Sequence, residues 1–181
     1  PAPPLPPLGP RDLGAHMVTT QVTSYPFQSA AWALYSQGAL KGEITAKDLP
    51  QGTPDFLNTS FYRLLIPGLN KAYPDTAMAL TINATAVPGV TLEAGKVPIS
   101  ADTDLIFSVI KPDKTLAPGF TLGCNISASI GAEVHSGNIT GKIGDATLKL
   151  DAVSSAYGRL GPYIISLLQD PMELVVNHVI L

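Results

Sequence analysis

A long alternation of apolar and polar residues after Phe120 constrains the fold of this chain more than any other feature. The apolar even positions are Leu122, Cys124, Ile126, Ala128, Ile130, Ala132 and Val134. Side chains of a β-strand point alternately to the two faces of a sheet, so this period predicts one apolar face and one wet face. The alternation indicates a strand well beyond the usual length.

A second alternation, after the turn-like Ser136-Gly137, predicts a long strand that pairs with the first. Its apolar residues keep one parity up to Ile143 and take the other from Ala146 to Leu150. One extra residue near Gly144-Asp145 would produce that slip, and a glycine there suits a β-bulge. The apolar face needs a cover, and the best candidate is the C-terminal segment Gly161–Leu181.

The remaining patterns predict an α+β fold, in which helices and strands alternate before a meander of strands. A helix is expected over 24–38, capped by Ser24, and a second over 55–73, interrupted or restarted at Pro67-Gly68. The last helix opens at Pro162 and is expected to kink at Pro171. Further strands are expected at 17–23, 40–46, 77–87, 90–94, 96–100 and 104–111.

Composition favours an extracellular protein and excludes general attraction to polyanions. Charged residues make up 14% of the chain, against roughly 25% in typical domains. The net charge of −3 supplies no general attraction to nucleic acid or anionic membranes. We expect no transmembrane segment and no signal peptide, and we expect the chain to be a processed or excised piece of something longer.

Four of the six asparagines begin an Asn-X-Ser/Thr sequon, where random placement would give roughly one. Two of them fall on the polar face of the expected long strands, where a glycan could be carried. The pattern predicts a secreted glycoprotein, the alternative being that these are ordinary polar positions of a Ser/Thr-rich chain. The sequons begin at Asn58, Asn83, Asn125 and Asn138.

Catalytic and metal-binding patterns are missing from the sequence. The histidines His16, His135 and His178 are far apart, and none has a His, Cys or carboxylate neighbour at metal-ligand spacing. No Gly-X-Ser-X-Gly elbow and no glycine-rich phosphate loop occurs. We therefore expect no enzyme activity, no catalytic residue, no metal and no cofactor. A small hydrolase would need a Ser-His constellation that these histidines do not supply.

Cys124 is the single cysteine, so no internal disulfide can form. Its parity places it on the apolar face, which predicts a buried thiol in the core. The alternatives are a mixed disulfide with another chain and a reactive thiol.

The order of the elements, together with several short matches, resembles the C-terminal domain of the bactericidal/permeability-increasing protein (BPI), lipopolysaccharide-binding protein (LBP) and PLUNC family. The matches cover about Met17 to Leu181 and keep their order and spacing. They are FQSAAWALYSQGAL from Phe27, Leu65-Ile66-Pro67, Lys71-Ala72-Tyr73-Pro74, Gly141-Lys142-Ile143, Lys149-Leu150 and GPYIISLLQD from Gly161.

The resemblance implies a long twisted antiparallel sheet wrapped around long helices, with an apolar pocket for lipid acyl chains. Family members bind lipopolysaccharide, phospholipid or cholesteryl ester, and many act in mucosal innate defence. The alternative for each apolar position is ordinary core. The residues expected to line the pocket are Trp32, Tyr35, Leu64, Leu65, Leu80, Ile82, Ile126, Ile130, Ile164, Leu168 and Val175.

The chain departs from the family pattern in three ways. Nothing matches the family's N-terminal domain, with its basic lipopolysaccharide-binding tip and its disulfide. The closing segment after the last helix is also missing. Finally, the excess of acidic residues weakens the case for direct killing of bacteria. We therefore expect residues 1–16 to be a proline-rich linker or tail and 17–181 to be a partial C-terminal domain. Such a domain could pair with the N-terminal domain of a longer chain.

Two hypotheses of function follow from this sequence. The first is a secreted, noncatalytic lipid-binding protein that holds acyl chains of lipopolysaccharide or phospholipid in an apolar groove. The second is a structural or interaction module with a filled core and no lipid ligand, which could associate through an unpaired strand edge. Lipid that copurifies with the protein would discriminate between them.

Overall fold

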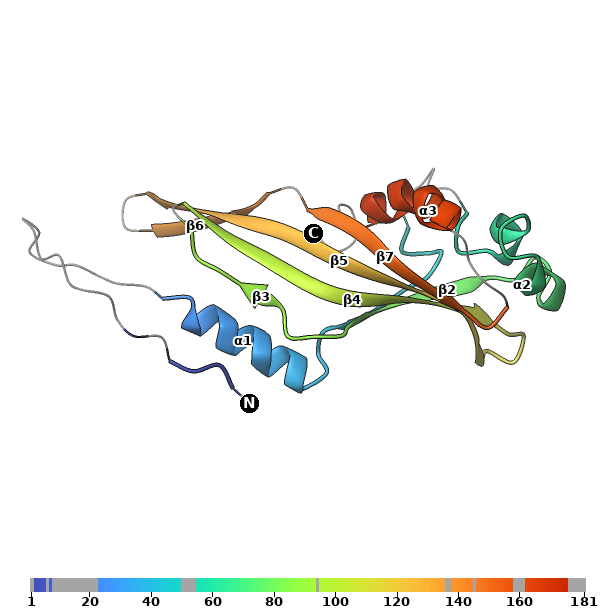
Figure 1. Cartoon of the computed structure of the whole chain (residues 1–181), viewed down its shortest axis with the longest axis horizontal. Coiled ribbons are helices and arrows are strands. Elements are labelled where there is room, and N and C mark those ends of the chain that lie inside the picture. Colours follow the sequence, from blue (N-terminus) through green and yellow to red (C-terminus); the bar gives the residue numbers. More distant parts are fainter. Residues whose placement is uncertain are drawn as a thin grey trace, which may run out of the picture.

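The computed structural model describes residues 2–5, 7, 23–49, 55–93, 95–135, 138–144, 146–157 and 162–175, and it shows a large antiparallel sheet with helices at both ends (Figure 1). In chain order the elements are α1 (Tyr25–Ser36), β1 (Lys41–Ile44), the 3-10 helix η1 (Thr59–Tyr62), α2 (Pro67–Ala72), β2 (Met78–Ala84), β3 (Gly89–Val90), β4 (Lys96–Ile110), β5 (Leu116–His135), β6 (Asn138–Ile143), β7 (Thr147–Ser155) and α3 (Pro162–Val175).

The described strands form one seven-stranded antiparallel sheet, which confirms the α+β class. The main order is β1-β2-β4-β5-β6, while β3 pairs with β4 and β7 pairs with β5. Strands β4 and β5 run the length of the molecule (Figure 1). Strand β5, with 20 residues, therefore pairs with β4 on one side and with both β6 and β7 on the other.

The predicted parity slip is confirmed at the junction of β6 and β7. Ile130 pairs with Ile143 and Ser127 pairs with Thr147, so β5 advances three residues while its partner advances four. The backbone N–H of Gly144 donates to the Ser129 carbonyl at 2.7 Å. A Cβ at Gly144 would meet Ser129 atoms at 3.0 and 3.2 Å, so glycine suits this approach. The predicted second long strand is consequently two strands, β6 and β7.

Two further irregularities bend the sheet. Phe107 pairs with Phe120 but Ser108 pairs with Pro118, which leaves Gly119 as an extra residue of β5. A Cβ at Gly119 would lie 2.5 Å from the Phe107 carbonyl oxygen, so only glycine fits there. The other irregularity lies opposite Gly123 and Cys124, where β7 carries the extra residue. Bulges of this kind increase the local right-handed twist.

Four element predictions are wrong. The strand expected at 90–94 is only the two-residue β3, Gly89–Val90. The segment 55–73, expected to be one helix, contains only the short helices η1 and α2, which are joined by a turn. The predicted restart at Pro67 is confirmed, because α2 begins there. The strands expected at 96–100 and 104–111 are one strand, β4, because Asp102 and Thr103 find partners on β5. Ser24 precedes α1 but its side chain makes no capping hydrogen bond. Residues 17–22 and 176–181 lie outside the described part of the chain.

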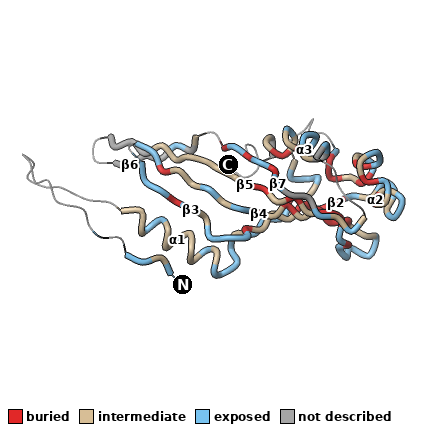
Figure 2. Tube along the Cα trace, in the orientation of Figure 1, coloured by how far each residue is buried: buried red, intermediate tan, exposed pale blue. Residues whose placement is uncertain are grey.

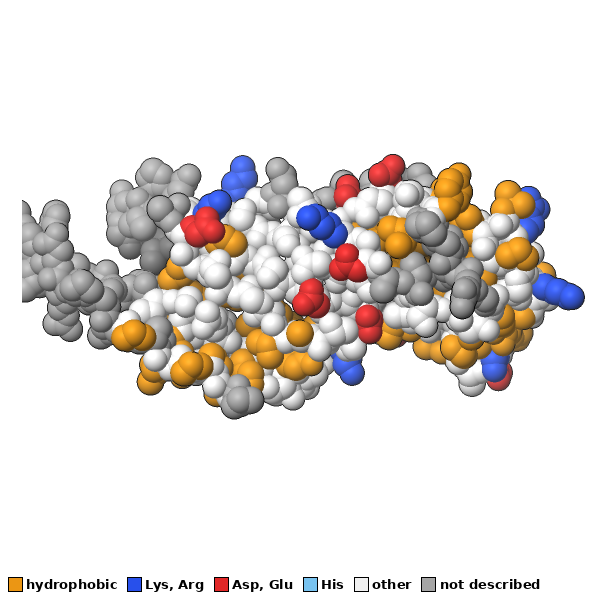
Figure 3. Space-filling view, viewed as in Figure 1, with side chains coloured by type: hydrophobic (Ala, Val, Ile, Leu, Met, Phe, Trp, Pro, Cys, Tyr) orange, Lys and Arg blue, Asp and Glu red, His pale blue; other side chains and the backbone are white. Residues whose placement is uncertain are grey.

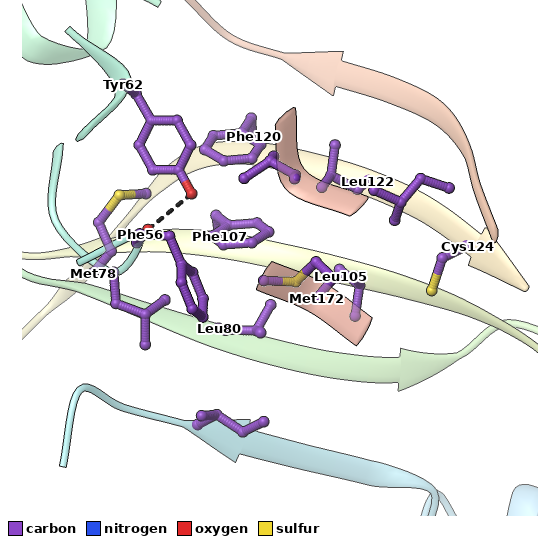
Figure 4. Close-up of a cluster of buried hydrophobic side chains, with 14 of the residues drawn as sticks. Phe56, Tyr62, Met78, Leu80, Leu105, Phe107, Phe120, Leu122, Cys124 and Met172 are labelled. Atoms are coloured by element: carbon purple, nitrogen blue, oxygen red, sulfur yellow. Dashed lines mark hydrogen bonds between the residues drawn. The ribbon is translucent and has the colours of Figure 1, made fainter. Parts of the chain in front are cut away.

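The main core lies at one end of the sheet, under η1, α2 and α3 (Figure 2). Phe107 and Phe120 stack with ring centroids 4.4 Å apart, and Tyr62 meets Phe120 edge-on at 4.9 Å. The Tyr62 hydroxyl donates to the Phe56 carbonyl at 2.8 Å (Figure 4). Burial raises the pKa of the Tyr62 phenol well above its ordinary value. These aromatic rings anchor the packed end of the molecule.

Helix α3 covers part of this core, as expected for the C-terminal segment. Leu168 and Met172 are fully buried between the helix and the sheet. The Gln169 amide donates to the Leu148 carbonyl of β7, which ties the helix to the strand beneath it. Pro171 lies inside the helix.

Candidate functional site

The apolar face of the sheet, called here the inner face, continues beyond the packed core. Its cross-strand pairs include Leu105 with Leu122 in the core and then Thr103 with Cys124. Past that pair, the inner-face partners are Ala101 with Ile126, Ile99 with Ala128 and Val97 with Ile130. The face therefore stays apolar along the full paired length of β4 and β5.

Burial falls along this face. Leu105 and Leu122 are 1% and 0% exposed. Beyond the Thr103–Cys124 pair, Ala101 is half-buried, Val97 at the far end is still buried at 9% exposure, and four further residues are only half-buried. Figure 2 shows the change from buried to intermediate positions along β4 and β5. We call these four residues the apolar strip: Ile99, Ile126, Ala128 and Ile130.

Helix α1 lies beside β3 at this less buried end, which we call the open end (Figure 1). Its Gln28 Nε2 donates to the Val90 carbonyl at 3.1 Å, and the Tyr35 hydroxyl donates to the Thr85 carbonyl at 2.8 Å. No residue of α1 is buried. Two side-chain hydrogen bonds thus fasten a helix that contributes little to any core.

Two grooves run along α1, one at each end of the helix. The first, of about 250 Å³, is lined by Pro3, Gln28, Trp32, Val87, Pro88, Gly89 and Val90. The second, of about 360 Å³, is lined by Tyr35, Ser36, Gly38, Leu40, Lys41, Asn83 and Ala84. Ligand pockets of proteins span about 300–1,000 Å³. The first groove lies below that range and the second near its lower limit, so each would hold a part of a lipid rather than all of it.

Hydrophobic side chains gather over α1 at the open end and over the α2 and α3 end of the molecule in Figure 3. On α1 itself, Phe27 and Leu34 are 43% and 48% exposed. The helix therefore presents apolar surface outward as well as toward the sheet.

The structure divides the residues predicted to line a lipid pocket. Leu80 and Leu168 are fully buried core residues, and Leu64 is 85% exposed, away from any core. Leu65, Ile82 and Ile126 are half-buried against the core, and Ile130 is half-buried farther along β5. Trp32 and Tyr35 line the two grooves. The side chains of Ile164 and Val175 lie outside the described ones.

Several lining residues escaped the sequence analysis. Gln28 precedes Trp32 by four residues and so lies on the same side of the helix, a helical spacing that could have found it. Ile99 belongs to the apolar strip through its pairing with Ala128, which sequence does not show. Val87 and Pro88 lie in the connection between β2 and β3, where no periodic pattern marked them.

The predicted glycosylation sites differ in their surroundings. Asn58 caps η1 with its Oδ1, and its amide donates to Asp75 at 3.1 Å. The Asn125 amide donates to Asp102 at 2.7 Å on the polar outer face. Asn83 lies in the groove beside Tyr35. All three are half-buried, and the side chain of Asn138 lies outside the described ones.

Cys124 is a free, buried thiol, as its parity predicted. Its Sγ lies 2.8 Å from the Thr103 hydroxyl. Burial raises the pKa of the Cys124 thiol, and the outer-face carboxylates of Asp104, Asp151 and Asp102 act in the same direction, while the Thr103 hydrogen bond opposes them. Because the thiolate is the reactive form, this environment holds the thiol unreactive.

The described residues contain no group of three or more His, Cys, Asp or Glu side chains placed to hold a metal ion. None of the described helices combines the length and apolar character needed to span a bilayer.

This is an α+β domain with a long bent antiparallel sheet that has one apolar face and is capped by short helices. Comparison with known proteins gives its family. The family model for the LBP / BPI / CETP family, C-terminal domain, matches residues 2–181. The chain therefore belongs to the LBP/BPI/CETP family and corresponds to its C-terminal domain.

Individual relatives agree with this assignment. The chain is 28% identical over 166 residues to bactericidal permeability-increasing protein of Sebastes schlegelii, covering 92% of this chain and 34% of that protein. It is 22% identical over 167 residues to lipopolysaccharide-binding protein of Bos taurus, covering 92% and 33%. A crystal structure of lipopolysaccharide binding protein superposes with a TM-score of 0.64 at 22% identity, covering 77% of this chain and 31% of that chain. The chain thus spans about a third of the length of these relatives.

Proposed function

We propose that this chain is a secreted, noncatalytic lipid-binding domain that holds acyl chains of lipopolysaccharide or phospholipid against the apolar strip, in the service of innate defence. The observation that carries the proposal is the continuation of the apolar inner face past the packed core, where Ile99 and Ile130 are only half-buried. Relatives are named for binding lipopolysaccharide and for increasing bacterial permeability, which supports the lipid class.

The energetics of such binding are those of apolar transfer. Each methylene moved out of water contributes about 0.8 kcal/mol, so a partly covered acyl chain supplies useful affinity without any charged partner. The strip is continuous with the buried core side chains, and its residue Ile99 pairs with Val90, which lines the first groove beside α1. Under the proposal, the apolar strip binds the acyl chain of the lipid, and Trp32 and Tyr35 lie at the border of the strip.

The experiment is mass spectrometry of organic extracts from protein made in a secretory cell line, with intact mass of the same sample. We expect stoichiometric acyl lipid, and glycan on at least one of the four sequons. A clean extract from folded, glycosylated monomer would overturn lipid binding. Bare asparagines at all four sequons would contradict secretion.

A matched pair of variants locates the lipid. Ile99 and Ile106 are both half-buried isoleucines of β4, but they lie on opposite faces, since Ile99 pairs with Ala128 and Ile106 with Thr121. We expect Ile99→Gln to lose most of the copurified lipid and Ile106→Gln to retain it, with both variants folded. Equal lipid content in the two variants would remove the inner face from the proposal.

The second candidate is a structural or interaction module with no lipid ligand. It is favoured by the complete burial of Leu80 and Leu168, two predicted pocket residues that instead fill the core. Under this alternative the domain would pair with another chain, such as the N-terminal domain of a longer protein. It predicts a clean extract together with concentration-dependent association in sedimentation velocity.

A further inference from the structure

The groove between α1 and β3 is built from two distant parts of the chain. Trp32 and Gln28 of α1 form one side, and the segment Val87–Val90 forms the other. The Gln28 amide bonds the Val90 carbonyl at 3.1 Å, which fixes the two sides relative to each other. The third component of the lining is Pro3, which lies more than 20 positions before α1 in the sequence.

Pro3 differs from its neighbours in the way a docked polyproline segment would. It is half-buried, whereas Ala2, Pro4 and Leu5 are exposed, Leu5 at 77%. A polyproline II helix repeats every three residues, so only one residue per turn faces a supporting surface. Burial of a single position within Ala2–Leu5 is the pattern expected of such a segment lying on a groove.

The groove chemistry also fits proline. Recognition of proline-rich segments uses shallow grooves lined by aromatic side chains, and the polyproline II conformation is already stiff before it docks. Here the groove has an indole, Trp32, next to the rigid ring of Pro88 and the apolar Val87. None of the described residues that line the groove is charged.

We propose that the surface formed by Gln28, Trp32 and the segment Val87–Val90 is a polyproline-binding site, and that its occupant is the chain's own proline-rich segment Ala2–Leu5, which we call the proline strap. The strap covers the Trp32 side of the open end. This assignment concerns the strap and the groove alone, and it holds whether or not the inner face carries lipid.

The required affinity is small because the strap is part of the same chain. A tethered segment reaches an effective concentration in the millimolar range, so a dissociation constant of about 1 mM suffices for half occupancy. The site therefore needs no deep pocket, and a shallow surface with one indole is adequate; the groove's volume of about 250 Å³ is the space that stays open beside Pro3.

Trp32 is the only tryptophan of the chain, so intrinsic fluorescence reports on this groove alone. The experiment uses the full 181-residue chain and two variants with the same substitution in the same segment, Pro3→Asp and Leu5→Asp. We expect Pro3→Asp to shift the Trp32 emission to the red and to increase its quenching by acrylamide. Leu5→Asp should leave both unchanged. Circular dichroism checks that the fold is intact.

Equal responses of the two variants, whether both shift or neither does, would overturn the proposal. A second measurement adds a synthetic PAPPLPPL peptide to the full-length Pro3→Asp chain. We expect a saturable return of the emission toward that of the unchanged chain, and no return with a peptide that carries the same Pro-to-Asp change. Absence of saturable return would also overturn the proposal. Neither measurement contains lipid, so failure here and failure of lipid binding are separately visible.

Discussion

The two ends of the sheet use the same strands in different ways. At the packed end, β4 and β5 bring Phe107 and Phe120 into a stack, and η1, α2 and α3 close over it. At the open end the same two strands carry Ile99 and Ile130 only half-buried, beside a helix without a buried residue. One continuous pattern of alternation therefore produces a core in one place and an accessible apolar face in another.

The difference lies in what covers the sheet rather than in the sheet itself. Helix α3 inserts Leu168 and Met172 into the core and adds a hydrogen bond from Gln169 to β7. Helix α1 is fastened by Gln28 and Tyr35 to backbone carbonyls and buries no side chain. Apolar burial of a side chain contributes about 1.5–3 kcal/mol, whereas a single hydrogen bond contributes about 1 kcal/mol. We therefore expect the open end to unfold before the packed end.

The largest expected effect separates the two ends by stability. Phe107→Ala should lower the free energy of unfolding by about 3–5 kcal/mol, because it leaves a cavity among buried rings. Ile130→Ala should lower it by only about 1 kcal/mol, because its side chain is already partly exposed to water. Urea denaturation of both variants measures this, and equal losses would mean that the open end is as tightly packed as the core.

An alkaline pH titration should report on the buried core, where burial raises the pKa of the Tyr62 phenol and of the Cys124 thiol. Below pH 10 the Tyr62 phenol is protonated in both states; above it the unfolded state ionises, while burial keeps the folded pKa raised. Stability should therefore fall as pH rises above about 10, by up to about 1.4 kcal/mol per pH unit from this group.

The control for the titration is Tyr62→Phe. This variant should flatten the alkaline decline, and at neutral pH it should lower stability by about 1 kcal/mol, because the Phe56 carbonyl loses its hydrogen bond. An alkaline slope unchanged in Tyr62→Phe would assign the decline to another group.

The smallest expected effect is confined to α1. Tyr35→Phe removes the hydrogen bond to the Thr85 carbonyl, and the local loss should be about 1 kcal/mol or less. Hydrogen exchange should speed up across α1 while the denaturation midpoint stays the same. Ser36→Ala, which removes only a bond to Trp32 within the helix, is the matched control. A lowered denaturation midpoint, or exchange changes spread over β4, would show that α1 is part of the cooperative core.

The sequence predicted those features that repeat along one strand. Alternation is a local property, so the length of β5, the burial of Cys124 and the parity slip near Gly144 could all be predicted. Prediction failed where a distant partner decides the conformation. Asp102 and Thr103 resembled a break in β4, yet Asn125 and the Cys124 carbonyl satisfy them across the strand pair.

The segment 55–73 failed for a related reason. Its apolar residues have helical spacing, but Asn58 caps a single 3-10 turn and Tyr62 points into the core to meet Phe120. Tertiary packing and one local cap thus outweigh the periodicity. The grooves beside α1 could not be predicted at all, because their shape depends on where the helix is held relative to β3.

The antiparallel pairing of the whole sheet also determines how the molecule can assemble. Strand β1 pairs with β2, β2 and β3 pair with β4, and β4, β6 and β7 pair with β5. Each described strand therefore pairs with a strand that follows or precedes it by only a few elements in the order of synthesis. Pairings such as Lys41 with Asn83 and Phe120 with Ser155 nevertheless join residues far apart in the sequence, so the sheet closes its loops at a larger entropic cost than a helical bundle and is expected to fold more slowly. Strand pairing can follow synthesis from the N-terminus, and α3 seals the core last.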